Sequence, residues 1–134
     1  MSKQIYITLP VRDVEKAKTF YTALGYAIDP KFSGDNAACI VIGENICLML
    51  SGHDFFKQLA NKDVCDTSTH MQALFALVAD SREQVDELLG KVLAAGGREA
   101  HEPEEYGFMY QRAFHDLDGH GFAVNCMTPQ SEEN

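Results

Sequence analysis

The sequence predicts an α+β fold in which two βαβββ modules build a curved mixed sheet around a cavity. Strand-like apolar segments occur at 5–9 and again at 74–78, and an amphipathic helical segment follows each of them. Turn-rich, strand-like sequence then follows each helix. Because two such modules share a chain of 134 residues, we expect their strands to enclose one common cavity.

The chain is expected to form a single domain over residues 1–134, with an internal repeat. The first module spans 4–50 and the second spans 71–127. Between them, 51–70 breaks the pattern and is predicted to be a linker or lid. Residues 128–134 are predicted to be a frayed tail.

The first module opens with a strand whose two faces differ. Ile5, Ile7 and Leu9 fall on one face, which the following helix is expected to cover, whereas Tyr6 and Thr8 are left on the concave side. That helix is predicted to begin after an Asp13 N-cap and to end at Gly25, with apolar residues at positions 14, 17, 20, 21 and 24.

Three strands are then predicted at about 26–32, 37–42 and 45–50, separated by the Gly- and Asn-containing turns at 34–36 and 43–45. In the segment 51–70, Asp54 is a candidate cap for a short helix that carries Phe55, Phe56 and Leu59.

In the second module, Ser81-Arg82-Glu83-Gln84 is typical of a capping box at a helix start. Strands are predicted at about 98–102, 107–114 and 121–126, with Asp118-Gly119 as the turn of the last hairpin. His115 and His120 flank that turn and are expected to be solvated.

Composition excludes several classes of partner. The formal charge is −9, from 20 acidic and 11 basic residues, so neither nucleic acid nor an anionic membrane is an expected partner. No apolar run is long enough for a membrane helix and no signal peptide is visible, so a cytoplasmic location is expected. The four cysteines have no metal-knuckle spacing and are expected to be buried small apolar residues.

Two segments resemble a known superfamily. The stretch Leu9-Pro10-Val11-Arg12-Asp13-Val14-Glu15-Lys16-Ala17-Lys18-Thr19-Phe20-Tyr21, followed by Leu24-Gly25-Tyr26, is similar to the opening of vicinal oxygen chelate proteins. This superfamily contains the glyoxalases, the bleomycin-resistance proteins and the extradiol dioxygenases. Phe114-His115-Asp116-Leu117-Asp118-Gly119-His120 resembles its closing hairpin, with Leu117 where the family usually has proline.

The resemblance also implies where a metal would be bound, and these positions lack suitable ligands. Metal-using members bind the ion through side chains from four inward strand positions. In chain order, the first position is His or Gln, the second is Glu, the third is His or Glu, and the fourth is Glu. In this chain the positions fall on Tyr6, Met49 (Leu48 if the register slips by one), Leu74 and Ala123. Such side chains do not suit a hard or borderline divalent ion, so no metal and no cofactor are expected. His70 is the best rescue ligand if the register slips.

The remaining inward side chains predict a small-molecule pocket. The expected ligand-binding residues are Tyr6, Thr8, Met49, Leu74, Ala76, Tyr110, Arg112 and Ala123. Tyr110 and Arg112 share a strand face that we expect to border the concave side, where Arg112 would hold an anionic group. Alternatively, Met49 and Leu74 are plain core, and Arg112 pairs with an acid such as Asp116 or a glutamate of the first module.

Three functions remain open. The first is a metal-free protein that binds a small organic molecule, which the missing ligands favour. The second is a metal-independent enzyme with Tyr6 or Tyr110 as general acid, although no inward carboxylate completes the pair. The third is the metal-dependent lyase or dioxygenase that the superfamily implies. A homodimer is expected because single-domain members of the superfamily commonly pair edge to edge.

Overall fold

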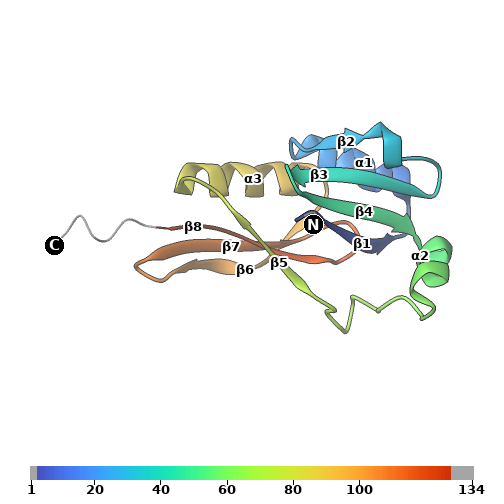
Figure 1. Cartoon of the computed structure of the whole chain (residues 1–134). Helices are drawn as coiled ribbons and strands as arrows, with labels where there is room; N and C mark the ends of the chain where they lie inside the picture. Colours follow the sequence, from blue (N-terminus) through green and yellow to red (C-terminus); the bar gives the residue numbers. More distant parts are fainter. Residues whose placement is uncertain (1–2, 128–134) are drawn as a thin grey trace. The chain divides into compact units, whose positions relative to one another are not determined.

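The computed structural model of the chain describes residues 3–127. The predicted frayed tail at 128–134 lies outside these residues. The chain divides into two compact units, Met1–Asp66 and Thr67–Asn134. Each unit holds a four-stranded mixed sheet and a long helix, so the predicted α+β fold with two βαβββ modules is confirmed, with one sheet for each module (Figure 1).

The first unit consists of β1 (Ile5–Val11), α1 (Val14–Ala23), β2 (Ala27–Asp29), β3 (Ala37–Gly43), β4 (Ile46–Gly52) and α2 (His53–Ala60). The strands lie in the order β1-β4-β3-β2. β1 runs parallel to β4, and the other neighbours are antiparallel. β1 and β2 are therefore the two edges of this sheet.

Local sequence sets the ends of α1 as predicted. The Asp13 side chain accepts a hydrogen bond from the backbone N–H of Lys16 at 3.0 Å, which satisfies one of the free donors of the first turn. Gly25 follows the helix with a φ of +106°, a conformation that glycine adopts without strain.

The strand predicted at 26–32 is shorter than expected. β2 ends at Asp29, and Pro30–Phe32 forms a turn of 3-10 helix in place of the predicted second half of the strand at 26–32. Proline supplies no N–H to a strand ladder but suits the first turn of a helix, and Asp29 Oδ1 caps that turn by accepting from the N–H of Lys31 at 2.9 Å.

The face of the first sheet that α1 covers forms the core of this unit. Residues of this face on three neighbouring strands, Leu9, Ile40, Leu48 and Leu50, are almost completely buried. Phe20 and Tyr21 of α1 are buried as well and contact each other edge to face, with ring centroids 5.0 Å apart. α2 forms where the short helix was predicted and contacts β1 and β4, but the predicted Asp54 cap is wrong, because the helix begins at His53 and Asp54 lies within its first turn. The opposite face of the sheet is called the open face below.

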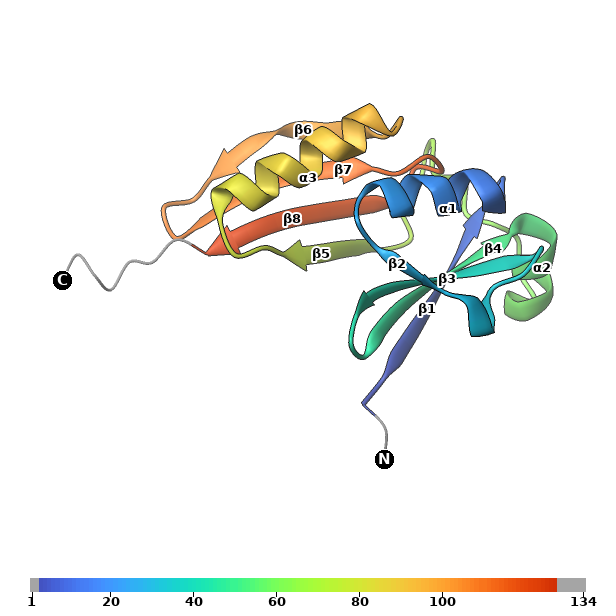
Figure 2. The ribbon, with the colours of Figure 1, turned by 90° about the horizontal axis from the view of Figure 1, so that it is seen from above.

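The second unit consists of β5 (Leu74–Val78), α3 (Arg82–Ala94), β6 (Arg98–Glu105), β7 (Met109–His115) and β8 (Gly121–Met127). Its strands lie in the order β5-β8-β7-β6, and β5 is parallel to β8. Figure 2 shows α3 lying along one face of this sheet. Val85, Leu89 and Val92 of the helix are fully buried, and Phe114 and Phe122 stack in parallel with centroids 4.9 Å apart.

The closing hairpin of the second unit is held by a buried carboxylate. Asp116 Oδ1 accepts hydrogen bonds from the N–H groups of Asp118 and His120, both at 2.9 Å, and Gly119 takes a φ of +83°. His120 is buried, so its expected solvation is wrong; the Asp116 side chain turns the backbone around this histidine. Across residues 3–127, no helix combines the length and apolar character needed to span a membrane.

Candidate functional site

The open face of the first sheet carries two rows of side chains that cross all four strands. The strand registers place one row as Asp29, Cys39, Met49 and Thr8, in the order β2, β3, β4, β1. The neighbouring row is Ala27, Val41, Cys47 and Tyr6. The face therefore combines a floor of sulfur-containing and apolar side chains with two hydroxyl groups on the edge strand.

Two aromatic rings meet across this floor. Tyr6 lies on β1, whereas Phe32 follows β2 at the opposite edge of the sheet, yet their ring centroids are 6.0 Å apart in an edge-to-face contact. Strands β4 and β3 lie between those edges, so the rings pass over them. Both rings are about half exposed, whereas Cys39 and Cys47 beneath them are 0% and 5% exposed. The Tyr6–Phe32 pair is called the aromatic cover below.

The pKa values of Cys39 and Tyr6 on this face are both raised. Burial raises the pKa of Cys39 to about 11, and the hydrogen-bonded thiol of Cys47 and the charge of Asp29 add to the effect. Desolvation raises the pKa of the Tyr6 phenol, and the neighbouring Cys47, Cys39 and Asp29 raise it further. At neutral pH the face therefore presents a protonated phenol and a protonated Cys39 thiol.

Ser51 is the one buried hydroxyl within residues 3–127 whose oxygen finds no hydrogen-bond partner there. Its register partners are Pro10 on β1 and Ala37 on β3, which places it on the open face, two positions along β4 from Met49. A buried hydroxyl without a hydrogen bond costs about 1–3 kcal/mol, so such a group calls for a partner from outside the chain. Ser51 is thus a candidate ligand contact.

The predicted site residues of the first module lie where the strand alternation placed them. Tyr6, Thr8 and Met49 all lie on the open face, opposite the face that α1 covers. Tyr6 is half exposed, and its hydroxyl accepts a hydrogen bond from Gln4 Nε2 at 3.2 Å. Met49 is only partly buried, so it is not a fully enclosed core residue.

In the second module, Leu74, Ala76 and Ala123 also lie on a face that no helix covers. Leu74 pairs with Gly121 and Ala76 with Ala123 in the parallel β5–β8 ladder. Leu74 is 75% exposed, and its side chain lies directly over Gly121, where a Cβ would approach Leu74 Cδ2 to 2.8 Å. This surface is apolar and offers no charged group at the predicted positions.

Tyr110 and Arg112 lie on the other face of the second sheet, so their predicted position on the concave side is wrong. Their register partners on β8 are Cys126 and Val124, both buried on the α3 side. Tyr110 donates to Asp86 Oδ1 of α3 at 2.7 Å, and Arg112 Nη1 donates to the same oxygen at 3.0 Å. Both side chains thus join β7 to α3.

Arg112 is saturated with acidic partners. Besides Asp86, it donates two hydrogen bonds to Glu99 Oε2 on β6, from Nε at 3.1 Å and from Nη2 at 3.0 Å. The sequence left two alternatives for Arg112, an anionic group of a ligand or an ion pair within the chain. The ion pair is correct, although its acids are Asp86 and Glu99 instead of Asp116 or a first-module glutamate. Arg82 adds a cation–π contact, with its guanidinium carbon 3.9 Å from the centre of the Tyr110 ring.

The side chains at the superfamily's metal positions do not fit a divalent ion. Tyr6 and Met49 on the first sheet and Leu74 and Ala123 on the second offer a phenol, a thioether and two hydrocarbon groups. Among residues 3–127, no three His, Cys, Asp or Glu side chains gather closely enough to hold a metal ion. His70 is exposed, and its Nδ1 lies 2.7 Å from the hydroxyl oxygen of Thr69.

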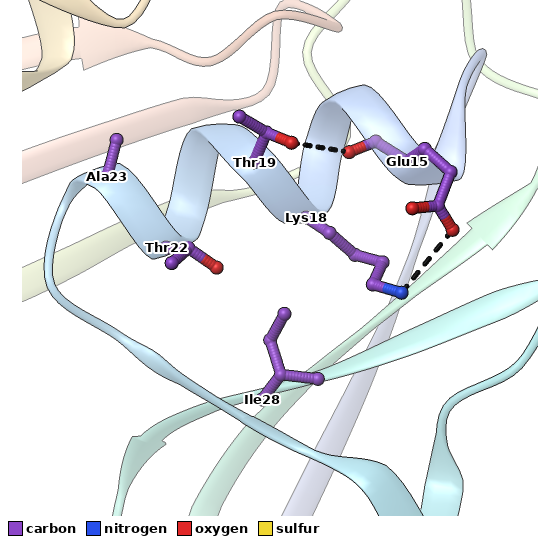
Figure 3. A pocket seen from close by; sticks show the side chains of 6 residues that line it. All are labelled: Glu15, Lys18, Thr19, Thr22, Ala23 and Ile28. Atoms are coloured by element: carbon purple, nitrogen blue, oxygen red, sulfur yellow. Dashed lines mark hydrogen bonds and ion pairs between the residues drawn. The ribbon is translucent and has the colours of Figure 1, made fainter.

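Two shallow grooves lie outside the open face of the first sheet. One, of about 440 Å³, lies between α1 and β2 and is lined by Glu15, Lys18, Thr19, Thr22, Ala23 and Ile28 (Figure 3). Its one ion pair joins Lys18 Nζ to Glu15 Oε2 at 3.3 Å. The other, of about 320 Å³, runs along β6 and is lined by Glu99, His101, Glu102 and Pro103. Neither groove contains a predicted site residue.

Sequence reasoning missed Ser51, Cys39 and Phe32 as parts of the open face. Ser51 lies at the boundary between the predicted strand and the predicted linker, although strand alternation from Met49 places it on the same face. Cys39 is found by the same alternation along its strand. The position of Phe32 could not be inferred, because it depends on the 3-10 turn that replaces the end of the predicted strand.

Comparisons with known proteins agree with this topology. Residues 4–43 match the sequence profile of a family described as bleomycin resistance protein-like, N-terminal. Among solved structures, a hypothetical protein from S. aureus is 29% identical with a TM-score of 0.81, over 94% of this chain and 95% of that one. A search of curated protein sequences gives no match.

Two further structures share the fold at lower identity. A glyoxalase/bleomycin resistance protein/dioxygenase family enzyme from Burkholderia phytofirmans is 21% identical with a TM-score of 0.80, over 92% of this chain and 97% of that one. A lactoylglutathione lyase from Agrobacterium tumefaciens is 19% identical with a TM-score of 0.66, over 94% of both chains. The chain therefore has the glyoxalase/bleomycin-resistance fold, and its residues 4–43 are similar to the N-terminal part of bleomycin resistance protein-like sequences.

Proposed function

We propose that this protein binds a small organic molecule through its open sheet face, without a divalent metal ion. The observation that carries the proposal is the buried Ser51 hydroxyl, which lacks a hydrogen-bond partner among residues 3–127. A polar group of the ligand bonded to Ser51 would satisfy it. Tyr6 and Thr8 add two more hydroxyl groups on the same face, at the edge strand.

The rest of the face suits an apolar or aromatic ligand body. Met49 is a flexible thioether that adapts to irregular shapes, and the aromatic cover supplies ring faces for stacking. A few polar groups on a mostly apolar surface are the usual composition of a small-molecule site. The resemblance to bleomycin-resistance proteins supports a binding role of this kind.

The alternative of a metal-dependent lyase or dioxygenase has less support. The four side chains at the superfamily's metal positions cannot act as ligands for a hard divalent ion, so we derive no metal-dependent step. A metal-independent enzyme would need an acid–base pair. Asp29 shares the open face with Tyr6, but its Oδ1 already caps the 3-10 turn at Lys31. Binding therefore remains the best-supported function.

A thermal-shift screen tests the proposal. A panel of small aromatic and heterocyclic molecules should include members that raise the melting temperature, equally with and without EDTA, because a ligand that binds only the folded state stabilises it. Ser51→Ala should weaken that shift. Hits that lose their effect in EDTA, or that stabilise Ser51→Ala as much as the wild type, would contradict the proposal.

A further inference from the structure

Three sulfur atoms lie together on the open face of the first sheet. The register pairs Cys39 of β3 directly with Met49 of β4, and Cys47 lies two residues before Met49 on the same face of β4. Cys47 is the diagonal neighbour of Cys39 across the two strands, and its side chain is close enough to raise the pKa of the Cys39 thiol. All three side chains belong to the two central strands of the sheet.

Backbone hydrogen bonding brings Cys39 and Met49 especially close. The N–H of Cys39 donates to Ser33 Oγ at 3.0 Å, and that serine follows β2, so Cys39 directs its backbone groups away from β4. The Cys39–Met49 pair is therefore of the non-hydrogen-bonded kind, whose Cα atoms lie about 4.5 Å apart with the side chains in closest approach. The long Met49 side chain can then reach an ion held between the two thiols.

We propose that Cys39, Cys47 and Met49 form a three-sulfur site for one Cu(I) ion. Thiolate and thioether groups are soft ligands that select Cu(I) over hard divalent ions, and none of the three side chains carries a hard oxygen donor. The Cys39 and Cys47 thiols are almost completely buried near the aromatic cover, which favours a monovalent ion with little need for hydration. Of the three residues, only Met49 falls on one of the superfamily's divalent-metal positions.

Binding balances as a simple exchange of protons for the ion. Cu(I) and two thiols give a complex of two thiolates, one thioether and Cu(I), with release of two protons and a net charge of −1. Copper stays in the Cu(I) state, so neither an oxidant nor a reductant takes part. The site does not depend on the organic ligand of the proposed function, and either proposal can fail alone.

Anaerobic titration of the reduced, full-length protein with Cu(I) tests this inference. Bathocuproine disulfonate competes for the ion and reports by its colour how much the protein retains. We expect the wild type to retain one Cu(I) per chain and to show no comparable retention of Zn(II). X-ray absorption at the copper edge should show three sulfur neighbours, whereas a shell of nitrogen and oxygen atoms would overturn the proposal.

Substitutions of the sulfur-containing residues test which of them bind Cu(I). Substitution of a residue that only hydrogen-bonds to a metal ligand lowers the metal affinity about 10–100-fold. Because Cys47 is itself a proposed ligand, Cys47→Ser should lower the affinity for Cu(I) on the order of 100-fold or more. Met49→Leu keeps the side-chain volume and should weaken binding while preserving the fold. Cys65→Ser and Cys126→Ser are matched controls and should bind as the wild type does. If Cys47→Ser does not fold, Met49→Leu decides, and unchanged retention of Cu(I) by Met49→Leu contradicts the three-sulfur site.

Discussion

Ser51 and Ser33 are two serines of the first unit with opposite hydrogen-bonding states. Ser33 Oγ donates to the carbonyl oxygen of Asp29 at 2.7 Å and accepts from the N–H of Cys39 at 3.0 Å. Ser51 Oγ is buried and has no such partner within residues 3–127. The contrast separates a serine that holds the fold together from one whose buried hydroxyl is unsatisfied within residues 3–127.

We therefore expect opposite effects on stability from the two alanine substitutions. Ser51→Ala should raise the free energy of unfolding of the ligand-free protein by about 1 kcal/mol, because it removes an unsatisfied buried hydroxyl. Ser33→Ala should lower it by about 1 kcal/mol, because it leaves an N–H without its acceptor. Urea unfolding of the two variants measures both changes. A loss of stability in Ser51→Ala equal to that in Ser33→Ala would show that Ser51 has a partner.

The aromatic cover should slow the reaction of the Cys39 and Cys47 thiols. Phe32→Ala should speed modification of Cys39 and Cys47 by a disulfide reagent, because removal of the ring exposes thiols that are now buried. Phe108 is also about half exposed but lies in the second unit, so Phe108→Ala is the matched control. Mass spectrometry of the labelled peptides follows each thiol separately. Equal rates in Phe32→Ala and the wild type would show that the ring does not cover the thiols.

At the scale of elements, α3 is joined to β7 by the Asp86 carboxylate, whose pKa is lowered. The hydrogen bond from Tyr110 is the main cause that lowers the pKa of Asp86, and Arg112 acts in the same direction. A carboxylate whose pKa is lowered by folding stabilises the fold above its unfolded value of about 3.9. This contribution is lost as the pH falls through the lowered native pKa.

Asp86→Asn should therefore destabilise the protein at pH 7, with a difference from the wild type that shrinks as the pH falls below about 4. Thermal unfolding between neutral and acidic pH measures this convergence. Glu87→Gln, at the next position of α3, is the control for loss of a charge and should leave the stability at pH 7 unchanged, because none of the ion pairs found within residues 3–127 involves Glu87. A constant difference at all pH values would contradict the assigned role of Asp86.

Elements that carry a local signal could be predicted from the sequence. The Asp13 and Ser81 caps, the apolar stripes of α1 and α3 and the turn at Gly119 all form as expected. The face of β7 could not be inferred correctly, because alternation says which residues share a face and not which face is covered. Tyr110 and Arg112 have the same parity as Phe114, and α3 covers that side.

Some residues of the candidate site could be predicted from the sequence, and others could not. Tyr6, Thr8 and Met49 follow from strand alternation once the covered face of β1 is known. The role of Ser51 and the position of Phe32 depend on which hydrogen bonds form and on contacts between segments distant in the sequence, and neither is encoded in local periodicity.

At the scale of the whole molecule, we propose that the chain forms a homodimer. β5 is an edge strand of the second sheet, and its Leu74 and Val78 are about three-quarters exposed. An exposed apolar edge strand readily pairs with another chain. Analytical ultracentrifugation should show a dimer that Val78→Lys weakens, while Glu87→Lys on α3 leaves it unchanged. A wild-type monomer at micromolar concentration would contradict this proposal.

The central claim is that the open face of the first sheet binds a small organic molecule without a divalent metal. Amide chemical-shift mapping of the isotope-labelled protein in EDTA, titrated with the strongest thermal-shift hit, tests it most directly. We predict that the largest shifts occur at Tyr6, Thr8, Met49 and Ser51. Shifts confined to the groove between α1 and β2, or shifts that appear only after a divalent ion is added, would contradict the claim.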